Sequence, residues 1–143
     1  MKKVQELEVA VWPLQNNVII KNQKLSFCQY GKELGTAPVI LINHALQSNS
    51  DCMQHWEGLI GKNKAIDLDF FTVLCFDVPG NDLQHIKYYQ NKGIGARDIA
   101  VLFWLSLFEL NVDELFAVIG ADLGGGIAWE MATLFPKRIQ NLI

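Results

Sequence analysis

One ten-residue stretch constrains the fold more than any other part of the chain. Residues 117–126 read Ala-Val-Ile-Gly-Ala-Asp-Leu-Gly-Gly-Gly, an apolar segment that runs into a cluster of glycines. This pattern predicts a buried strand, a tight turn and a helix in direct succession. The small residues Gly120 and Gly124 let the helix pack close to the strand, so the residue between them is held on a sharp bend.

The spacing is that of a nucleophile elbow, Gly-x-Ser-x-Gly, with Asp122 in the place of the serine. In such a turn the central residue sits on a strained strand-to-helix bend and projects its side chain above the sheet. Aspartate is among the non-glycine residues that best tolerate a positive φ. We therefore expect the backbone geometry of the elbow to survive the exchange, while the chemistry at Asp122 stays open.

Three continuous apolar runs predict strands that are covered on both faces of a sheet. They lie at residues 39–43, 70–76 and 115–119. Helices are expected at 96–110 and at 123–135, the second ending before Pro136, which cannot continue a helix. The first helix is apolar almost all round, so the sheet and a further layer should cover it. Buried strands alternating with helices indicate a parallel α/β sheet.

The remaining segments complete the outline of the fold. Short apolar runs predict an N-terminal meander of three strands, at 9–11, 17–20 and 25–30. Residues 81–95 are the one long irregular stretch, and such stretches often carry binding function. Residues 139–143 have the pattern of a further strand that is beginning. We expect residues 1–143 to be the N-terminal part of a single domain, incomplete at its C-terminus and without a separate second domain.

Composition excludes several classes of function. Half of the residues are hydrophobic and the net charge is −3, with lysines and arginines scattered along the chain, so neither nucleic acid nor a membrane is expected as partner. The basic N-terminus is followed by no apolar segment of a signal peptide. The three cysteines have neither metal-site nor redox spacing, and Cys75 falls inside an apolar run, which together favour a reducing cytoplasm.

Several further segments share a relationship to one known family. They are Ile-Asn-His-Ala-Leu at 42–46, Trp56 with Leu-Ile-Gly-Lys-Asn-Lys-Ala-Ile-Asp at 59–67, Phe-Thr-Val-Leu-Cys at 71–75, Ala-Arg-Asp-Ile at 96–99, and the elbow with its helix at 118–131. Together they resemble the homoserine O-acetyltransferase family of the α/β-hydrolase superfamily. The resemblance covers most of residues 38–143, and the segment 61–67 separates this family from other α/β hydrolases.

The resemblance implies an α/β-hydrolase fold, a mostly parallel sheet with helices on both faces. It also implies acyl transfer from acetyl-CoA to homoserine in methionine biosynthesis, in the cytoplasm. Acetyl-CoA would then be a co-substrate, with no bound cofactor and no metal. The expected partners are a small-molecule substrate and, for assembly as a homodimer, a second copy of the chain.

The resemblance also assigns roles at the elbow. Asp122 holds the nucleophile position, and the backbone N–H groups of Leu46 and Leu123 form the oxyanion hole, in which one donor is worth ~2.7–4 kcal/mol. In this superfamily the acid and the histidine of the triad follow the nucleophile along the chain. The histidines at 44, 55 and 85 precede the elbow and are therefore not the catalytic base, so both partners are expected beyond Ile143.

Two departures from the family pattern leave alternatives open. Asp122 replaces the serine, and residues 81–90 replace a longer loop that helps to shape the substrate pocket, so the substrate stays open. Proteins resembling haloalkane dehalogenases and epoxide hydrolases use an aspartate to form an alkyl ester that water then cleaves. Those families typically have tryptophan after the aspartate and His-Gly in the oxyanion loop, whereas this chain has Leu123 and His44-Ala45.

Several of these residues also have a purely structural interpretation. Asp122 could serve only as the N-cap of the helix, worth about 1 kcal/mol, in a non-catalytic relative with a binding or structural role. The glycines at 124–126 match neither nucleotide-binding motif, and His44 is expected to shape the oxyanion loop. The tryptophans at 56, 104 and 129 are expected to serve in packing and not as ligand contacts. Arg97 and Asp98 begin a helix, which indicates capping, and the family resemblance adds a structural ion pair.

Overall fold

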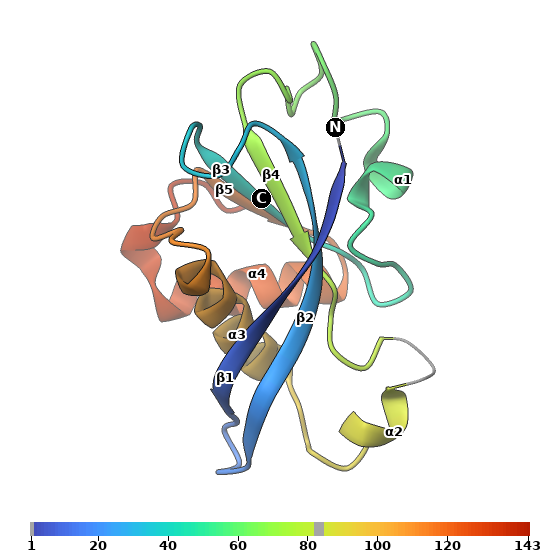
Figure 1. The fold of residues 1–143 in the computed structure, drawn as a ribbon, viewed down its shortest axis with the longest axis vertical. Helices are drawn as coiled ribbons and strands as arrows, with labels where there is room; N and C mark the ends of the chain where they lie inside the picture. Colours follow the sequence, from blue (N-terminus) through green and yellow to red (C-terminus); the bar gives the residue numbers. More distant parts are fainter. Residues whose placement is uncertain (1, 82–84) are drawn as a thin grey trace.

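The computed structural model describes residues 2–81 and 85–143 (Figure 1). The described chain forms one five-stranded sheet in the order β1-β2-β4-β3-β5. The strands are β1 (Lys3–Pro13), β2 (Ile19–Gly31), β3 (Val39–Asn43), β4 (Thr72–Phe76) and β5 (Ala117–Gly120). Strands β4, β3 and β5 run parallel, and β1 and β2 join them in antiparallel pairings. This is the parallel α/β core that the sequence predicts, with an antiparallel edge.

The N-terminal region is a long hairpin, so the predicted meander of three strands is wrong. Residues 19–31 form a single strand of 13 residues, and its pairing with β1 keeps one register from Lys3↔Gln29 to Pro13↔Ile19. The polar run at 21–24 does not end the strand because its backbone pairs with β1 while its side chains, apart from the buried Gln23, face outward. Asn22 adopts a φ of 53° within this run.

Alternate residues of the parallel strands face two separate hydrophobic cores. One core joins Leu41, Leu74 and Val118 to the two long helices. The other joins Ile40, Val73 and Cys75 to the segments that follow β3. Because β3 and β4 are buried along their whole length, both faces of the sheet are covered, as their apolar runs indicate. The predicted strand at 70–76 begins two residues later, since Phe70 is 68% exposed in a turn.

Helices lie on both faces of the sheet (Figure 1). On one face α3 (Ala96–Glu109) packs against α4 (Leu123–Leu134), in agreement with the two predicted helices, and α4 ends just before Pro136. On the other face lies the short α1 (Cys52–Trp56), which the sequence pattern does not indicate. A four-residue helix, α2 (Ile86–Tyr89), interrupts the long stretch at 81–95, and a 3₁₀ turn (Pro136–Arg138) follows α4.

Residues 139–143 lie beside β5, as the predicted further strand requires. The Val118 N–H donates to the carbonyl of Asn141 at 3.0 Å, and the Ile143 N–H donates back to Val118 at 3.0 Å. The bridge between Val118 and Leu142 is parallel. The parallel part of the sheet therefore continues past β5 with backbone pairing of the same sense.

The start of α3 shows how its charged residues are used. The Asp98 carboxylate accepts hydrogen bonds from the Gly95 N–H at 2.9 Å and from the Gln15 N–H at 2.8 Å, so it caps the helix and also holds the hairpin turn. Arg97 pairs with Glu130 of α4 at 2.8 Å. Both the capping role and an ion pair are therefore present, and the ion pair joins the two long helices.

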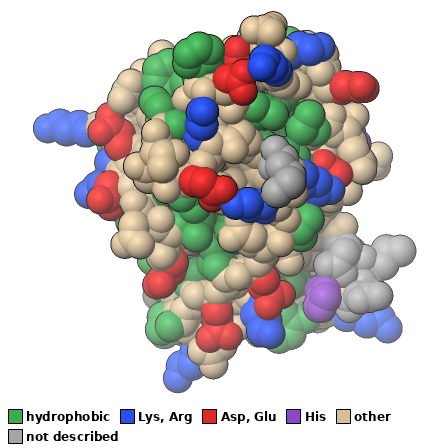
Figure 2. Space-filling view, turned by 45° about the horizontal axis from the view of Figure 1, so that its top comes forward, with side chains coloured by type: hydrophobic (Ala, Val, Ile, Leu, Met, Phe, Trp, Pro, Cys, Tyr) green, Lys and Arg blue, Asp and Glu red, His purple; other side chains and the backbone are tan. Residues whose placement is uncertain are grey.

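The remaining features of the fold are the distribution of surface charge and the positions of the tryptophans. On the face seen in Figure 2, acidic and basic side chains are interspersed without a region of one sign. Trp104 is buried against Met131, as predicted, and Trp56 packs at the edge of the second core. Trp129 is 64% exposed, so its predicted packing role is wrong. It lies on the side of α4 that turns away from the sheet.

Candidate active site

The turn between β5 and α4 has the geometry of a strained elbow. Asp122 adopts φ 54° and ψ −126°, a combination that costs a non-glycine residue roughly 1–3 kcal/mol. A Cβ at Gly120 would lie 2.2 Å from the carbonyl oxygen of Gly124, and a Cβ at Gly124 would lie 2.1 Å from the carbonyl oxygen of Asn43. Both positions therefore require glycine, because β3, β5 and α4 approach one another through their backbones.

The Asp122 side chain does not cap the helix that it precedes. No hydrogen bond joins its carboxylate to the first turn of α4. Instead, the Leu46 backbone N–H donates to Asp122 Oδ2 at 3.4 Å, a distance beyond the usual range for a strong N–H···O bond. The capping interpretation of Asp122 is thus wrong. The carboxylate is exposed and faces the loop that follows β3.

Leu46 lies within a tight turn that His44 supports. The Ser48 N–H donates to the carbonyl of Ala45 at 3.0 Å, which closes a turn over residues 45–48. The His44 ring bridges two segments, because Nε2 accepts from the Val78 N–H at 3.0 Å while Nδ1 lies 2.7 Å from the Ala45 carbonyl. Since Nε2 is an acceptor, the proton is on Nδ1 and the ring is neutral. His44 therefore shapes this loop, as its sequence position suggests.

The protonation state of His44 follows from its surroundings. The side chain is buried, with 2% of the residue exposed, and this burial lowers the pKa of His44 below its usual value. The hydrogen bond to the Ala45 carbonyl and the charge of Asp77 oppose the shift. The neutral ring is also the form that the Val78 N–H requires, so geometry and burial favour the same state.

Leu123 is the second residue with a predicted oxyanion donor. It is the first residue of α4, so its N–H has no acceptor four residues earlier within the helix. The aligned peptide dipoles also place about half a positive charge at this end of a helix. The structure thus brings Leu46, Asp122 and Leu123 to one end of the parallel strands, while their catalytic roles remain predictions.

A cavity of about 340 Å³ adjoins these residues. Leu46 and Leu123 line it, together with residues 78–81 after β4 and residues 93–96 before α3. Ile86 and Tyr89 of α2 contribute apolar walls. Part of the long stretch at 81–95 therefore borders the elbow, and residues 82–84 of that stretch lie outside the described residues.

Asn43 is a feature of the site that the sequence motifs did not single out. It ends β3 directly under the elbow and is buried, with 1% exposed. Its side-chain N–H group lies 3.5 Å from the Gly124 carbonyl, whereas Oδ1 has no hydrogen-bond partner among the described residues. A polar side chain with a buried, unpartnered oxygen under the elbow is a feature that only the structure makes visible.

Comparison with known proteins bears on this geometry. A family model described as the alpha/beta hydrolase fold matches residues 38–143, from the start of β3 to the segment beside β5. The chain belongs to the α/β-hydrolase family. The predicted resemblance and fold class are therefore confirmed.

Individual relatives lie within the same superfamily. Homoserine O-acetyltransferase from Trichormus variabilis is 34% identical over 115 residues, which are 72% of this chain and 32% of that protein. The chain spans about a third of the length of the curated relatives it matches. Among solved structures, homoserine O-acetyltransferase from Bacillus anthracis superposes with a TM-score of 0.86 at 23% identity, over 99% of this chain and 46% of that one. Esterase E22 superposes with a TM-score of 0.84 at 25% identity, over 97% and 46%.

Within residues 2–81 and 85–143, no cluster of three or more His, Cys, Asp or Glu side chains has the geometry to hold a metal ion. No helix of the described chain is long and apolar enough to cross a membrane. The three cysteines are buried and unpaired, with Cys75 inside β4 as expected.

Proposed function

We propose that this protein transfers the acetyl group of acetyl-CoA to the hydroxyl of homoserine, in methionine biosynthesis in the cytoplasm. The observation that carries the proposal is the relationship to homoserine O-acetyltransferases over a region that contains both the elbow and the segment 61–67. A small-molecule substrate, no bound cofactor and a homodimer accompany the proposal. The family membership supports enzyme chemistry of the acyltransferase or esterase type.

The geometry of the site supports acyl transfer. A thioester carbonyl that is attacked develops negative charge on its oxygen, and backbone N–H groups preorganised around that oxygen stabilise it. The Leu46 N–H is directed toward the elbow residue, and the Leu123 N–H is free of an intrahelical acceptor at the positive end of α4. The adjoining cavity of about 340 Å³ has the size of a small-molecule site.

Asp122 changes the covalent step that a serine would make. Its carboxylate would attack the thioester carbonyl and expel the CoA thiolate, leaving a mixed anhydride on Asp122. The homoserine hydroxyl would then attack the acetyl carbonyl, which releases the acetyl ester and regenerates the carboxylate. The hydroxyl proton ends on the CoA thiol, so the atoms balance. A mixed anhydride is much more reactive than a serine ester, which makes this intermediate prone to hydrolysis.

The proposal is tested with the protein as its gene encodes it. Acetyl-CoA and homoserine are supplied, and both the released CoA thiol and the acetylated product are measured. The wild-type protein, Asp122→Ser and Asp122→Ala are compared, with circular dichroism to confirm that each is folded. We expect transfer by the wild type or by Asp122→Ser and none by Asp122→Ala. Absence of transfer from both of the first two, in folded protein, would refute the proposal.

A growth assay separates catalysis from a binding or structural role. A methionine auxotroph that lacks its own homoserine acetyltransferase is complemented with the wild type or with Asp122→Ala. Acyl transfer requires that the alanine variant fail to support growth. A binding or structural role would instead leave the biological function of the alanine variant intact, measured in the organism of origin.

A second function is favoured by one contact in the structure. The Leu46 N–H already donates to Asp122 Oδ2, so one carboxylate oxygen faces the oxyanion donor while the other is available to attack. This arrangement suits a hydrolase that forms an alkyl ester from a halide or an epoxide and stabilises the later attack of water at the carboxyl carbon. Mass spectrometry after incubation of a variant that lacks the distal base with such compounds would detect the ester on Asp122, because water no longer cleaves it. No adduct across a broad panel of them would eliminate this function.

A further inference from the structure

The loop that carries Leu46 is held in place by a neighbouring segment. This oxyanion loop, residues 44–51, connects β3 to α1, and the anchoring segment, residues 77–81, follows β4. Before Leu46, the Val78 N–H donates to His44 at 3.0 Å. After Leu46, the Asn81 side chain donates to the Ser48 carbonyl. The anchoring segment therefore contacts the oxyanion loop on both sides of the donor.

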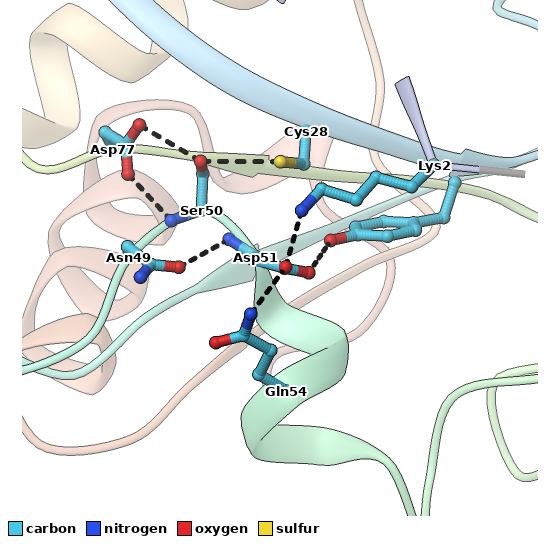
Figure 3. A network of polar contacts seen from close by, with 8 residues as sticks. Lys2, Cys28, Asn49, Ser50, Asp51, Gln54 and Asp77 are labelled. Atoms are coloured by element: carbon cyan, nitrogen blue, oxygen red, sulfur yellow. Dashed lines mark hydrogen bonds and ion pairs between the residues drawn. The ribbon is translucent and has the colours of Figure 1, made fainter. Parts of the chain in front are cut away.

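Asp77 makes the most extensive of these contacts (Figure 3). Its Oδ1 accepts the Ser50 backbone N–H at 2.7 Å, and its Oδ2 accepts the Ser50 hydroxyl at 3.0 Å. Hydrogen bonds to an ionised carboxylate are roughly twice as strong as neutral ones. Two such bonds to a single residue fix both its position and its orientation. Ser50 is buried, with 6% exposed, so water competes little for these bonds.

Asp77 is itself held by the sheet. Its backbone N–H donates to the Ser26 carbonyl of β2 at 2.9 Å, immediately after the β2–β4 pairing ends at Phe27↔Phe76. At the far end of the oxyanion loop, Tyr30 of β2 donates to Asp51 at 2.5 Å. Cys28 lies 3.5 Å from the Ser50 hydroxyl (Figure 3). The sheet thus provides a rigid base from which the Asp77 carboxylate reaches the loop.

We propose that Asp77 is a positioning residue, whose carboxylate fixes the oxyanion loop through Ser50 and thereby sets the position of the Leu46 N–H at the elbow. The inference rests on the proposed function in one respect, namely that Leu46 serves as an oxyanion donor. Asp77 touches no reacting atom in this scheme. It acts through Ser50, four residues after the donor, and shares this task with the backbone of Val78, which holds His44.

A spectroscopic test needs no catalytic activity. The backbone amide of Leu46 is observed by NMR in ¹⁵N-leucine-labelled protein and identified by its loss in Leu46→Met. Asp122→Ala removes the acceptor of this amide, so its proton signal should move upfield. Asp77→Ala removes the carboxylate that holds the oxyanion loop. In this background, the upfield shift of the Leu46 amide proton on Asp122→Ala should largely disappear. Asp77→Asn should retain the response, because its oxygen still accepts from the Ser50 N–H while its amide donates to the hydroxyl.

Two further variants make the test specific. Ser50→Ala loses the hydroxyl bond and keeps the backbone bond, so its response should be intermediate, and it remains informative if Asp77→Ala does not fold. The matched control is Asp67→Ala. The Asp67 carboxylate also accepts two loop N–H groups, from Asn63 at 3.1 Å and Asp69 at 2.9 Å, and among the described residues no hydrogen bond joins it to the oxyanion loop or the anchoring segment. In the Asp67→Ala background, the shift of the Leu46 amide on Asp122→Ala should equal the shift in the wild type.

Where acetyl transfer is measurable, kinetics provides an independent readout. A misplacement of about 1 Å can cost on the order of 10²-fold in rate, so Asp77→Ala should lower kcat by roughly 10–100-fold with little change in KM. Asp77→Asn should restore most of kcat. A KM effect without a kcat effect, or no rescue by asparagine, would overturn the proposal.

The outcomes separate this inference from the proposed function. An unchanged Leu46 response in folded Asp77→Ala would show that Asp77 supports only the fold, and the inference would be wrong. If Asp122→Ala leaves the chemical shift of the Leu46 amide unchanged in otherwise wild-type protein, Leu46 is not the donor at the elbow. Both proposals then lose their oxyanion hole. Absence of acetyl transfer together with the expected NMR pattern would count against homoserine acetylation alone and would support the positioning role.

Discussion

Replacing Gly124 by alanine should destabilise the protein, although alanine is the better helix former. Gly124 lies in the first turn of α4, where helix propensity alone favours alanine by roughly 0.5–1 kcal/mol. The new Cβ, however, would lie 2.1 Å from the Asn43 carbonyl oxygen and 2.8 Å from that of His44. Both obstacles are backbone atoms of β3 and its loop, so no side-chain rotation relieves the clash.

The magnitude follows from the displacement that is needed. An ordinary contact requires α4 to move away from β3 by roughly 1 Å, and overpacking of this kind costs about 1–3 kcal/mol, occasionally more. The movement would also loosen the strained Asp122 turn and the packing of Ile127 and Met131 against the core. Because the gain in helix propensity offsets part of the upper overpacking cost, we expect a net loss of about 2 kcal/mol, a substantial part of the ~5–15 kcal/mol by which a domain is stable.

Gly126 provides the matched control in the same helix. A Cβ there meets nothing within 4 Å, so Gly126→Ala should stabilise the protein by about 0.5–1 kcal/mol. Urea unfolding, followed by circular dichroism and tryptophan fluorescence, measures the free energy of both variants. If Gly124→Ala is as stable as Gly126→Ala, the close approach of α4 to β3 is wrong, and with it the account of the elbow.

Two other outcomes are expected. Because burial lowers the pKa of His44, the neutral ring contributes stability that is present above pH ~6.5 and is lost as the pH falls from there to the folded-state pKa. Urea unfolding at several pH values should show this decrease in the free energy of unfolding. His44→Gln should make the free energy of unfolding less dependent on pH over the same range. Asn43→Cys removes the unpartnered Oδ1 at similar volume, so the unfolding free energy should rise by about 1 kcal/mol, whereas a decrease would indicate an unseen partner.

Much of the fold follows from local properties of the sequence. The buried strands at 39–43 and 72–76 are continuous apolar runs, and α4 ends where Pro136 prevents its continuation. The tight turn of the elbow is indicated by residues 120–124, because a residue that tolerates positive φ lies between two glycines. These are properties of neighbouring residues, and they act in the same way wherever the segment lies in the molecule.

The position of polar partners was decided only by the tertiary structure. Asp122 looks like an N-cap in the sequence, yet its carboxylate faces the Leu46 N–H, 76 residues away. Ser50 and Asp77 carry no motif, and their bond depends on β3 and β4 being neighbours in the sheet. A hydrogen bond needs its donor and acceptor within about 3 Å, and for residues far apart in the chain only the packing of the strands sets that distance.

For the N-terminal hairpin and for Trp129, the sequence also indicates one arrangement and the tertiary structure decides another. The polar run at 21–24 reads as a break between strands, but pairing with β1 supplies its backbone hydrogen bonds and carries the strand through. Trp129 reads as a core residue, but its place on α4 turns it away from the sheet. Residue type determined that the chain forms an elbow on a buried parallel sheet. Which groups meet at that elbow was decided by strand order and helix packing, because these bring together residues that the sequence keeps far apart.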